Sequence, residues 1–355
     1  MSRSVRFALL IAALVAATVA VAGAAQARPA NTIDVFAGSS IQDAINAASP
    51  GDTIVVHPGV YHESLLIKKD NIKLHGSGAS ANGTVLEPSS SPTKLCMKGG
   101  SGICVFGSKS GGPVAGVQVQ GFLIRGFHVF GLIGSEAQNL LVTHNRFVND
   151  GEYGASSFVS TGTRFLYNVA AGAGEAGFYL GDTPKGNFVV RGNEAFGNTQ
   201  GIFLRDSAYG LIEDNDVHNN CIGIIVLDTG APTTAGHYTI QDNQAHQNNK
   251  FCPADPEGGP AVSGVGIALI GGNDDVVRHN TVWGNKPSKS NTFNPSGILL
   301  FSSKKLAGGA VETGNKIVGN QLYRNHALDI HWDGEGTNTF SKNKCDSSDP
   351  AGLCS

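Results

Sequence analysis

Charged residues are scarce in this chain of 355 residues. Asp, Glu, Lys and Arg make up 15% of it, and the formal net charge is −3, whereas roughly 25% of residues are charged in ordinary soluble domains. Without a basic excess, nucleic acid is not an expected partner. Only two methionines are present, which argues against a methionine-rich copper store. No Cys-x-x-Cys pair occurs, which argues against zinc or thioredoxin-like chemistry.

Glycine and apolar residues are plentiful instead. The chain contains 48 glycines, about twice the ordinary share of roughly 7%. Hydrophobic residues account for 41%, and there are only 14 prolines. Low charge combined with abundant glycine also occurs in disordered chains, but this apolar content is enough to build a core.

The first 27 residues have the pattern of an export signal. Two arginines in MSRSVR precede the apolar run FALLIAALVAATVAVAGAA, and AQA at residues 25–27 is a small-residue cleavage site. A membrane anchor is the alternative, because the apolar run is long for a signal. We expect cleavage after Ala27 and a single domain over residues 28–355 without a further membrane span. The mature protein is expected to be a secreted monomer, either extracellular or in the cell envelope.

A seven-residue phrase with an asparagine near each end recurs along the chain. Its clearest copies are HNRFVND, GNEAFGN, DNDVHNN, DNQAHQN, HNTVWGN and GNQLYRN. The leading asparagines of all copies, including weaker ones, are Asn145, Asn168, Asn193, Asn215, Asn243, Asn280, Asn320 and Asn343, and their shortest separations are 22 to 25 residues. Each repeat contains three short alternating stretches, such as QGIFLRD and LIEDN, which are typical of strands.

Three strands per repeat without a helix predict an all-β fold, a single-stranded right-handed parallel β-helix. Each strand would pair in parallel with its counterpart one coil later, ~4.8 Å away, and the coil would be right-handed like parallel crossovers in general. We expect each leading asparagine at a tight bend, in the left-handed conformation that Asn tolerates. Stacking would let the asparagine amides hydrogen-bond along the column.

The segment before the repeats begins with an amphipathic helix pattern. Ser39 or Ser40 can cap it, and Ile41, Ala44, Ile45 and Ala48 form its apolar face, so the helix would cover the open end of the solenoid. With the repeats, IQDAINAASPGDTIVVHPGVYHESLLIKKDNIKLHGSG resembles the pectin-lyase-like right-handed parallel β-helix superfamily. The resemblance is closest to secreted bacterial proteins of the copper-accessory (NosD-like) and carbohydrate-binding or sugar-hydrolase types. It implies the fold and a polysaccharide partner in a groove along one strand face. The catalytic motifs of polygalacturonases, pectinesterases and alginate epimerases are absent.

Four insertions surround one strand of the repeat. Residues 250–263 and 286–295 precede that strand on neighbouring coils, and residues 229–237 and 304–313 follow it. Loops at both ends of one strand column predict a groove with that column as its floor; alternatively, loops collect where the fold tolerates them. By alternation, the outward pairs of the floor are Tyr179 and Gly181, Phe203 and Arg205, Ile225 and Leu227, Ala268 and Ile270, and Leu299 and Phe301. Tyr179, Phe203 and Phe301 could stack on sugar rings or lie beneath the loops.

An acidic column follows the floor strand on successive coils. It consists of Glu136, Asp182, Asp206 and Asp228, with a gap at Val159. Neighbouring carboxylates ~5 Å apart could bind calcium, act as the acid and base of a glycosidase, or only form turns. Asp182, Asp206 and Asp228 are therefore candidate calcium ligands and candidate catalytic residues.

Two further candidate groups complete the site prediction. Lyases of the superfamily use a basic residue to remove a proton, a role that the resemblance would give to Arg205, although an ion pair with Asp206 is the simpler interpretation. Near the C-terminal end, HALDIHWDGEG contains His331 and Asp333 as candidate substrate-binding residues.

All six cysteines lie in the mature chain, and an even number in an exported protein suggests disulfides. Cys221 and Cys252 each follow an asparagine pair, one coil apart, so stacking would bring their backbones to ~5 Å, within the range of a disulfide. We predict this bridge and two local ones, Cys96–Cys104 and Cys345–Cys354.

Three functions fit the sequence. The first is a secreted lyase, hydrolase or epimerase that acts on a polysaccharide in the groove. The second is a non-catalytic, glycan-binding surface or matrix protein, and the third is an envelope accessory protein for metal delivery. The sequence leaves open whether the protein is an enzyme.

Overall fold

The computed structural model describes residues 29–355 except 92–93, 109, 255–258 and 291. The expected export signal, residues 1–27, lies outside this part of the chain. Residues Asn31–Ser355 form one compact unit. Among the described residues, no helix is both long and apolar enough to span a bilayer.

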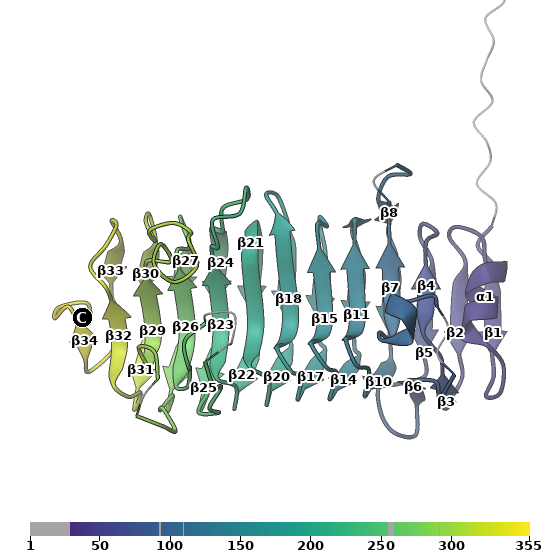
Figure 1. The fold of residues 1–355 in the computed structure, drawn as a ribbon, viewed down its shortest axis with the longest axis horizontal. Helices are drawn as coiled ribbons and strands as arrows, with labels where there is room; N and C mark the ends of the chain where they lie inside the picture. The colour runs from purple at the N-terminus through teal and green to yellow at the C-terminus, as the bar shows by residue number, and fades with distance from the viewer. Residues whose placement is uncertain (1–28, 92–93, 109, 255–258, 291) are drawn as a thin grey trace, which may run out of the picture. The chain divides into compact units, whose positions relative to one another are not determined.

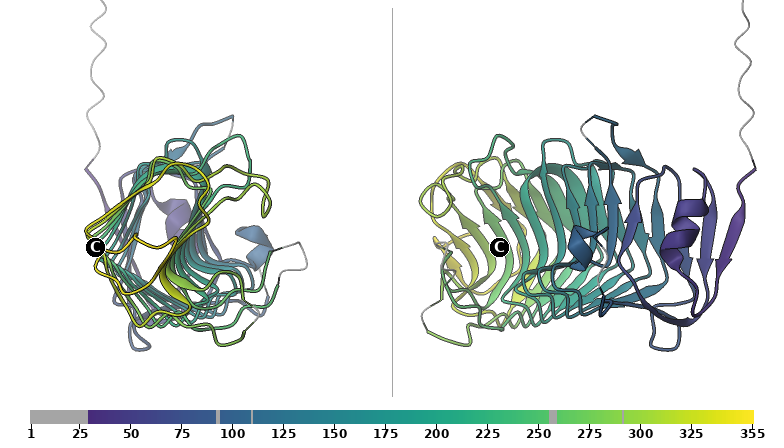
Figure 2. Two further views of the ribbon diagram at one scale, coloured as in Figure 1. Left: turned by 90° about the vertical axis from the view of Figure 1, so that its left-hand side faces the viewer. Right: turned by 45° about the vertical axis from the view of Figure 1, so that its right-hand side comes forward.

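The unit Asn31–Ser355 is a stack of coils, and each coil contributes one strand to each of three columns (Figures 1 and 2). We call the first the floor column. It contains β4 (Leu65–Ile67), β7 (Ile103–Phe106), β11 (Phe130–Ser135), β15 (Tyr153–Phe158), β18 (Ala176–Thr183), β21 (Gln200–Glu213), β23 (Ile222–Leu227), β26 (Val265–Ile270), β29 (Ser296–Phe301), β32 (Leu328–Trp332) and β34 (Ser348–Asp349).

The second column follows the floor column in the chain, and β21 runs through the corner into it. It contains β1 (Thr32–Val35), β2 (Thr53–Val56), β5 (Lys73–Gly76), β9 (Gln118–Gln120), β13 (Leu141–Thr143), β16 (Arg164–Leu166), β19 (Phe188–Arg191), the second half of β21, β24 (Gly236–Gln241), β27 (Val276–Arg278), β30 (Lys316–Val318) and β33 (Thr339–Ser341).

The third column completes each coil. It contains β3 (Gly59–His62), β6 (Thr84–Glu87), β10 (Phe122–Arg125), β14 (Arg146–Val148), β17 (Val169–Ala171), β20 (Glu194–Phe196), β22 (Asp216–His218), β25 (Gln244–His246), β28 (Thr281–Trp283) and β31 (Gln321–Tyr323). The short strands β8 (Val114–Ala115) and β12 (Ala137–Gln138) pair beside the floor column. Pairing within the columns is parallel, which confirms the predicted parallel coil of three strands.

Alternation along the floor strands separates an inner from an outer apolar layer. Ile202 pairs with Ile224, which pairs with Ile267. All three are fully buried in the core enclosed by the coil. Phe203 and Ile225, one residue further along, belong to a separate apolar cluster on the outer face. The predicted inward and outward positions of the floor are therefore confirmed.

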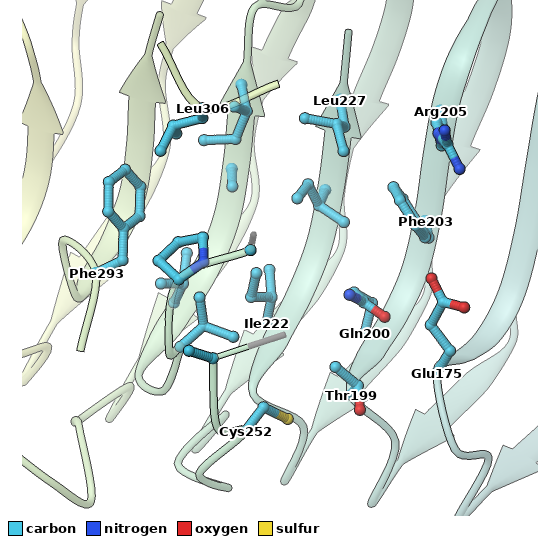
Figure 3. A pocket seen from close by; sticks show the side chains of 18 of the residues that line it. Glu175, Thr199, Gln200, Phe203, Arg205, Ile222, Leu227, Cys252, Phe293 and Leu306 are labelled. Carbon is cyan, nitrogen blue, oxygen red and sulfur yellow. The ribbon is translucent and has the colours of Figure 1, made fainter. Parts of the chain in front are cut away.

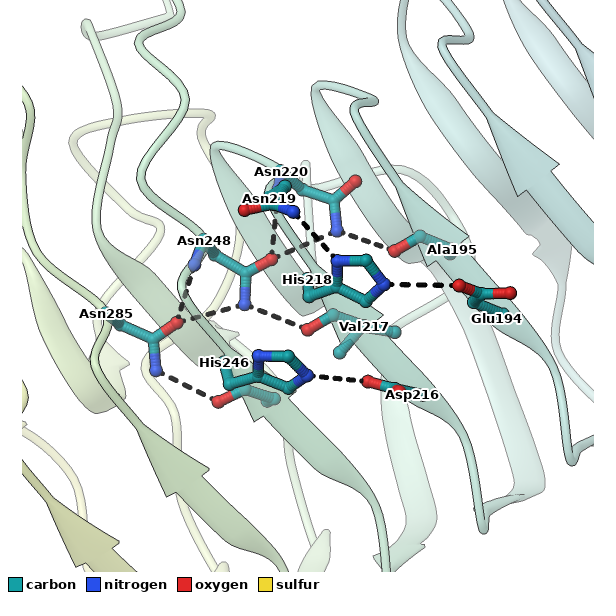
Figure 4. A network of polar contacts seen from close by, with 11 residues as sticks. Glu194, Ala195, Asp216, Val217, His218, Asn219, Asn220, His246, Asn248 and Asn285 are labelled. Atoms are coloured by element: carbon teal, nitrogen blue, oxygen red, sulfur yellow. Dashed lines mark hydrogen bonds and ion pairs between the residues drawn. The ribbon is translucent and has the colours of Figure 1, made fainter.

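The leading asparagines form a continuous ladder from Asn145 to Asn343, as predicted. Each Nδ2 donates to the Oδ1 of the next asparagine, with N···O distances from 2.9 to 3.2 Å. The second asparagine of the repeated phrase makes another ladder, which is partly drawn in Figure 4 and consists of Asn198, Asn220, Asn248, Asn285 and Asn325. The ladders satisfy buried polar groups at the corners of every coil in the repeat region.

The predicted left-handed conformation of the ladder asparagines is wrong. The residue before the asparagine adopts it instead: φ is 54° at His144, 55° at Asp214 and 55° at His279. The asparagine itself must turn its side chain inward while its backbone N–H donates to the Oδ1 of the next coil. The outward-facing residue before it therefore makes the bend.

A short helix lies beside β1 and β2 at the N-terminal end of the stack (Figure 1). It is α1 (Ile41–Ala47), and its N-cap is Ser40, whose Oγ accepts a hydrogen bond from the Asp43 N–H at 3.1 Å. The apolar side chains of α1 belong to the core inside the coil. The 3₁₀ turn η1 (Met97–Gly99) precedes β7.

Three disulfides join the predicted partners. The Cα–Cα distances are 5.5 Å for Cys96–Cys104, 6.0 Å for Cys221–Cys252 and 5.2 Å for Cys345–Cys354. The second bridge joins Cys221, directly before β23, to Cys252 in the insertion that precedes β26. Cys252 and Val262 also exchange two backbone hydrogen bonds, so the root of this loop is fixed at two points.

Candidate functional site

A groove with a volume of about 940 Å³ lies over the outer face of the floor column (Figure 3). All four predicted insertions contribute to its walls. One wall comes from residues 250–254 and 259–262 and from Phe293, and the opposite wall comes from Thr229, Leu306 and Ala307. The prediction of a groove between loops at both ends of the floor strands is confirmed.

The middle of the groove floor is apolar. Phe203, Ile225, Ala268 and Leu299 stand side by side on β21, β23, β26 and β29, as register partners, and all four line the groove. Each of them is at most 7% exposed, so only a small part of each side chain faces the groove.

The three aromatic candidates lie in different environments. Phe203 lines the groove. Tyr179 is buried, stacks on Tyr153 with ring centroids 4.6 Å apart, and does not line the groove. Phe301 packs against Phe293 with a centroid distance of 4.9 Å. Loop packing thus accounts for Phe301, and of the three only Phe203 lines the groove, with 4% of its surface exposed.

The end of the groove nearest β15 is polar. Glu152, Tyr153, Glu175, Gln200 and Arg205 line it. Glu152 and Glu175 occupy equivalent positions just before β15 and β18, and the Glu175 N–H donates to the Glu152 carbonyl at 2.8 Å. The two carboxyl groups are therefore neighbours on successive coils.

Burial and charge set the protonation of this polar end. Burial raises the pKa of Glu152, and the negative charge of Glu175 raises it further. Burial also raises the pKa of the Tyr153 phenol, with further contributions from the charge of Glu175 and from the hydrogen bond between the two side chains. The phenol therefore stays protonated, and its hydroxyl donates a hydrogen bond to the Glu175 carboxylate.

Arg205 is held in its charged form. Its Nε donates to Asp206 Oδ2 at 3.2 Å. Burial lowers the pKa of Arg205, but Tyr179, Asp206 and Asp182 together raise it above the usual value. A guanidinium in this setting does not accept a proton at ordinary pH, which favours charge stabilisation over proton removal as its role.

The acidic column serves the loop beside the groove. Asp206 is buried, and both its oxygens accept hydrogen bonds from Thr229, at 2.7 Å from the N–H and 2.6 Å from the hydroxyl. Asp228 is also buried and accepts from the N–H groups of Gly230 and Ala235. These contacts fix the beginning and the end of the loop of residues 229–235.

Three members of the column lie in turns. Glu136, Asp182 and Asp206 have φ angles of 50°, 58° and 45°, and Asp182 is exposed and accepts a 3.4 Å hydrogen bond from the Tyr179 hydroxyl. Within the described part of the chain, no group of three or more His, Cys, Asp or Glu side chains could hold a metal ion. Calcium binding by Asp182, Asp206 and Asp228 stays a prediction.

Comparison with known proteins identifies the fold family. Three overlapping stretches, residues 68–236, 131–308 and 199–355, match the family described as right handed beta helix region. The chain belongs to this family. No curated protein matches it.

Three solved structures with a similar fold are an epimerase module, a DFA-IIIase and a tailspike protein. The A-module of mannuronan C-5 epimerase AlgE6 from Azotobacter vinelandii has a TM-score of 0.56 and 17% identity, over 85% of this chain and 87% of the module. DFA-IIIase from Arthrobacter chlorophenolicus A6, without its lid, has a TM-score of 0.55 and 14% identity, over 89% and 92% of the two chains. The Dettilon tailspike protein has a TM-score of 0.55 and 15% identity, over 89% and 68%. At such identities the likeness shows the fold, and it confirms the predicted right-handed parallel β-helix.

His331 and Asp333 extend the floor of the β-helix beyond the groove. His331 pairs with Leu299 of the preceding coil, but neither His331 nor Asp333 lines the groove. Asp333 accepts hydrogen bonds from the N–H groups of Ser302 and Glu335. Burial raises the pKa of the adjacent Glu312 to about 8, with a further contribution from Asp333. These two candidates are therefore separated from the polar end of the groove.

The third column of the β-helix carries a stack of imidazoles. His218 and His246 are register partners with ring centroids 5.0 Å apart. Their Nε2 atoms face Glu194 Oε1 at 3.3 Å and Asp216 Oδ1 at 2.9 Å (Figure 4). Each imidazole thus contacts one carboxylate from the preceding coil, so the two histidines form side-chain pairs between successive coils.

Glu152, Glu175 and Gln200 line the groove but were not among the predicted site residues. The signal that could have found the two glutamates is their spacing, because Glu152 and Glu175 are one 23-residue repeat apart, the same step as from Asn145 to Asn168. The residue before each floor strand also has to lie at the rim of the floor. The acidic column marks the other end of the floor strand.

Proposed function

We propose that the groove binds a polysaccharide and that the protein is an exported, carbohydrate-active β-helix protein. The observation that carries this proposal is the composition of the groove: an apolar floor beside a polar end, between loops inserted into successive coils. Ligand sites in proteins commonly combine an apolar lining with a few placed polar groups. A sugar ring presents the matching surfaces, an apolar C–H face and a rim of hydroxyl groups.

The charges of the groove favour a neutral glycan over a polyuronate. Glu152 and Glu175 lie at the polar end, where a uronate carboxylate would meet like charges. The positive charge of Arg205 is already paired with Asp206. Lys250, on the loop wall, donates to the Gly197 carbonyl at 2.6 Å.

Two further observations support the proposal. A mannuronan C-5 epimerase module is among the structures of similar fold. The three disulfides suit a protein that is exported to an oxidising compartment. The alternative of metal delivery lacks comparable support, because the described residues offer no cluster of metal-binding side chains.

Binding to a glycan panel tests the proposal. Immobilised glucan, mannan, xylan and galactan, with alginate and polygalacturonate as charged comparisons, should include a neutral polymer that retains the protein. Phe203→Ala should weaken that binding about tenfold, which corresponds to ~1.4 kcal/mol, because it removes apolar floor. The matched control is Phe196→Ala, because the Phe196 side chain stacks on His218 in the third column, away from the groove. Equal affinity of the Phe203 variant and the wild type would place glycan binding elsewhere.

A further inference from the structure

The polar end of the groove brings together more than two acidic side chains. The groove ends against two glutamates, a buried tyrosine, an amide and a guanidinium. Figure 3 shows Glu175 reaching over the floor toward Phe203 and Gln200. The Gln200 Oε1 atom is buried and has no hydrogen-bond partner among the described residues, so this amide has an unused acceptor beside the groove.

We propose that Glu152 and Glu175 are the acid and the nucleophile of a catalytic centre that hydrolyses glycosidic bonds of a neutral polysaccharide. This inference rests on the proposed function, since the polysaccharide would lie along the apolar floor with the scissile bond over these two residues. Arg205 and Gln200 are positioning residues in this assignment, because they would orient the sugar.

The environments of the two glutamates suit different roles. Glycosidases need one carboxyl group that carries a proton and one that is ionised. Partial burial next to the negative charge of Glu175 favours the protonated form of Glu152. The Tyr153 hydroxyl donates a hydrogen bond to the carboxylate of Glu175, a contact that orients this carboxylate for the role of the nucleophile.

The position on successive coils predicts the stereochemical course. Neighbouring strands are ~4.8 Å apart, close to the ~5–5.5 Å carboxyl separation of retaining glycosidases. In the first step, a Glu175 oxygen bonds to the anomeric carbon while the glycosidic C–O bond breaks. The leaving oxygen takes the Glu152 proton.

In the second step, Glu152 removes a proton from water, and the water oxygen bonds to the anomeric carbon. The ester bond to Glu175 then breaks and regenerates its carboxylate. One water is consumed per bond, and the anomeric configuration is retained.

The carboxylates of the acidic column are less suited to this chemistry. The oxygens of Asp206 and Asp228 already accept hydrogen bonds that hold the loop of residues 229–235. A proton removal by Arg205, as a lyase would need, conflicts with its charged state beside Asp206. Hydrolysis is therefore the reaction that the described contacts favour over β-elimination.

The test uses the full mature chain and the neutral polymer that is retained best in the binding panel. Release of reducing ends is measured for the wild type, Glu152→Gln and Glu175→Gln, with Glu194→Gln in the third column as the matched control. We expect each groove variant to lose about 10²–10⁴-fold in rate, the range found for acid–base groups, while its affinity for the polymer stays within a few-fold. The control should cleave at the wild-type rate.

A 2,4-dinitrophenyl glycoside of the same sugar separates the two roles. Its leaving group departs without a proton, so Glu152→Gln should recover a large part of the activity and Glu175→Gln none. A wild type that binds the polymer but cleaves nothing, or groove variants that cleave at the wild-type rate, would overturn the inference and leave the proposed function intact. A wild type that binds no glycan at all would contradict both the proposed function and this inference.

Discussion

The asparagine ladders and the groove are built on the same coils, yet they use polar groups in opposite ways. In the ladders, both side-chain atoms of an interior asparagine bond within the protein. Asn243, for example, donates to the Ile212 carbonyl and to Asn280, and accepts from Asn215. At the polar end of the groove, carboxyl and amide groups line a cavity, and Gln200 Oε1 has no partner within the described structure. The comparison shows that the ladders stabilise the fold, whereas the groove presents polar groups that a ligand can contact.

Breaking the ladder should have the largest effect on stability. Asn243→Ala removes a buried amide that bonds to two neighbouring ladder residues and a carbonyl. Each buried group that loses its partner costs about 1–3 kcal/mol, so we expect a loss of at least ~4 kcal/mol in the free energy of unfolding. Denaturant titration measures it. Gln244→Ala, at the adjacent exposed position, should change the value by less than about 0.5 kcal/mol; similar losses in both variants would contradict the ladder's role.

A buried carboxyl group between the backbone of Tyr238 and the side chain of Asn315 gives the next largest effect. Asp275 is fully buried; its Oδ1 accepts from the Tyr238 N–H, and its own N–H donates to Asn315. Burial raises its pKa to about 8. The folded state therefore binds a proton that the unfolded state loses near pH 4, so wild-type stability should fall as pH rises from about 4 to 8.

Asp275→Asn should reduce this pH dependence and raise stability by a few kcal/mol above pH 8, because an amide supplies a donor and an acceptor without charge. A smaller slope of the same sign should remain from Glu312, whose pKa burial also raises to about 8. The control is Asp274→Asn at the exposed neighbouring position. Thermal unfolding from pH 4 to 9 measures the stability of the wild type and of both variants. A wild-type slope of the opposite sign, or a slope that is undiminished in the Asp275 variant, would show that Asp275 is not responsible.

The middle disulfide should affect both regions of the molecule. Replacing Cys221 and Cys252 by Ala should cost roughly 2–4 kcal/mol of stability and also weaken glycan binding, because Cys252 lines the groove. The matched control replaces Cys345 and Cys354, whose bridge ties the C-terminal tail. It should lower stability and leave the affinity for glycan unchanged. Equal affinities for glycan in the two double variants would show that the bridge between Cys221 and Cys252 does not contribute to glycan binding.

Calcium should have the smallest effect. Asp206 and Asp228 already accept hydrogen bonds from the adjacent loop, so a cation held with Asp182 would bind weakly. We expect millimolar calcium to raise the melting temperature by about 1 °C or less by mass action, and Asp206→Ala to abolish that rise. A rise of several degrees would show that the carboxylates serve a metal rather than the loop.

The fold could be predicted from the sequence because its determinants repeat. Asn145, Asn168 and Asn193 return at nearly constant spacing, and each needs a partner in the next coil. The same alignment placed the groove floor at Phe203 and Ile225 and paired Cys221 with Cys252. Wherever one coil constrains the next, periodicity alone carries the three-dimensional information.

The chemistry of the groove could be predicted only in part. Glu152 and Glu175 occur on two coils and not on the following ones, so no long pattern marks them. Asp206 and Asp228 looked equivalent to catalytic carboxylates, but the path of the loop that follows β23 decides that they accept its N–H groups. The conformation of an inserted loop does not follow from the repeat, and neither do the contacts it makes.

A crystal structure of the Glu175→Gln variant with an oligosaccharide of the retained polymer tests the central claim most directly. The account predicts sugar rings over Phe203 and Ile225, with one glycosidic oxygen within hydrogen-bond distance of the Glu152 carboxyl group. An oligosaccharide bound on the third column, or on the outer side of the loops with the groove left vacant, would contradict it.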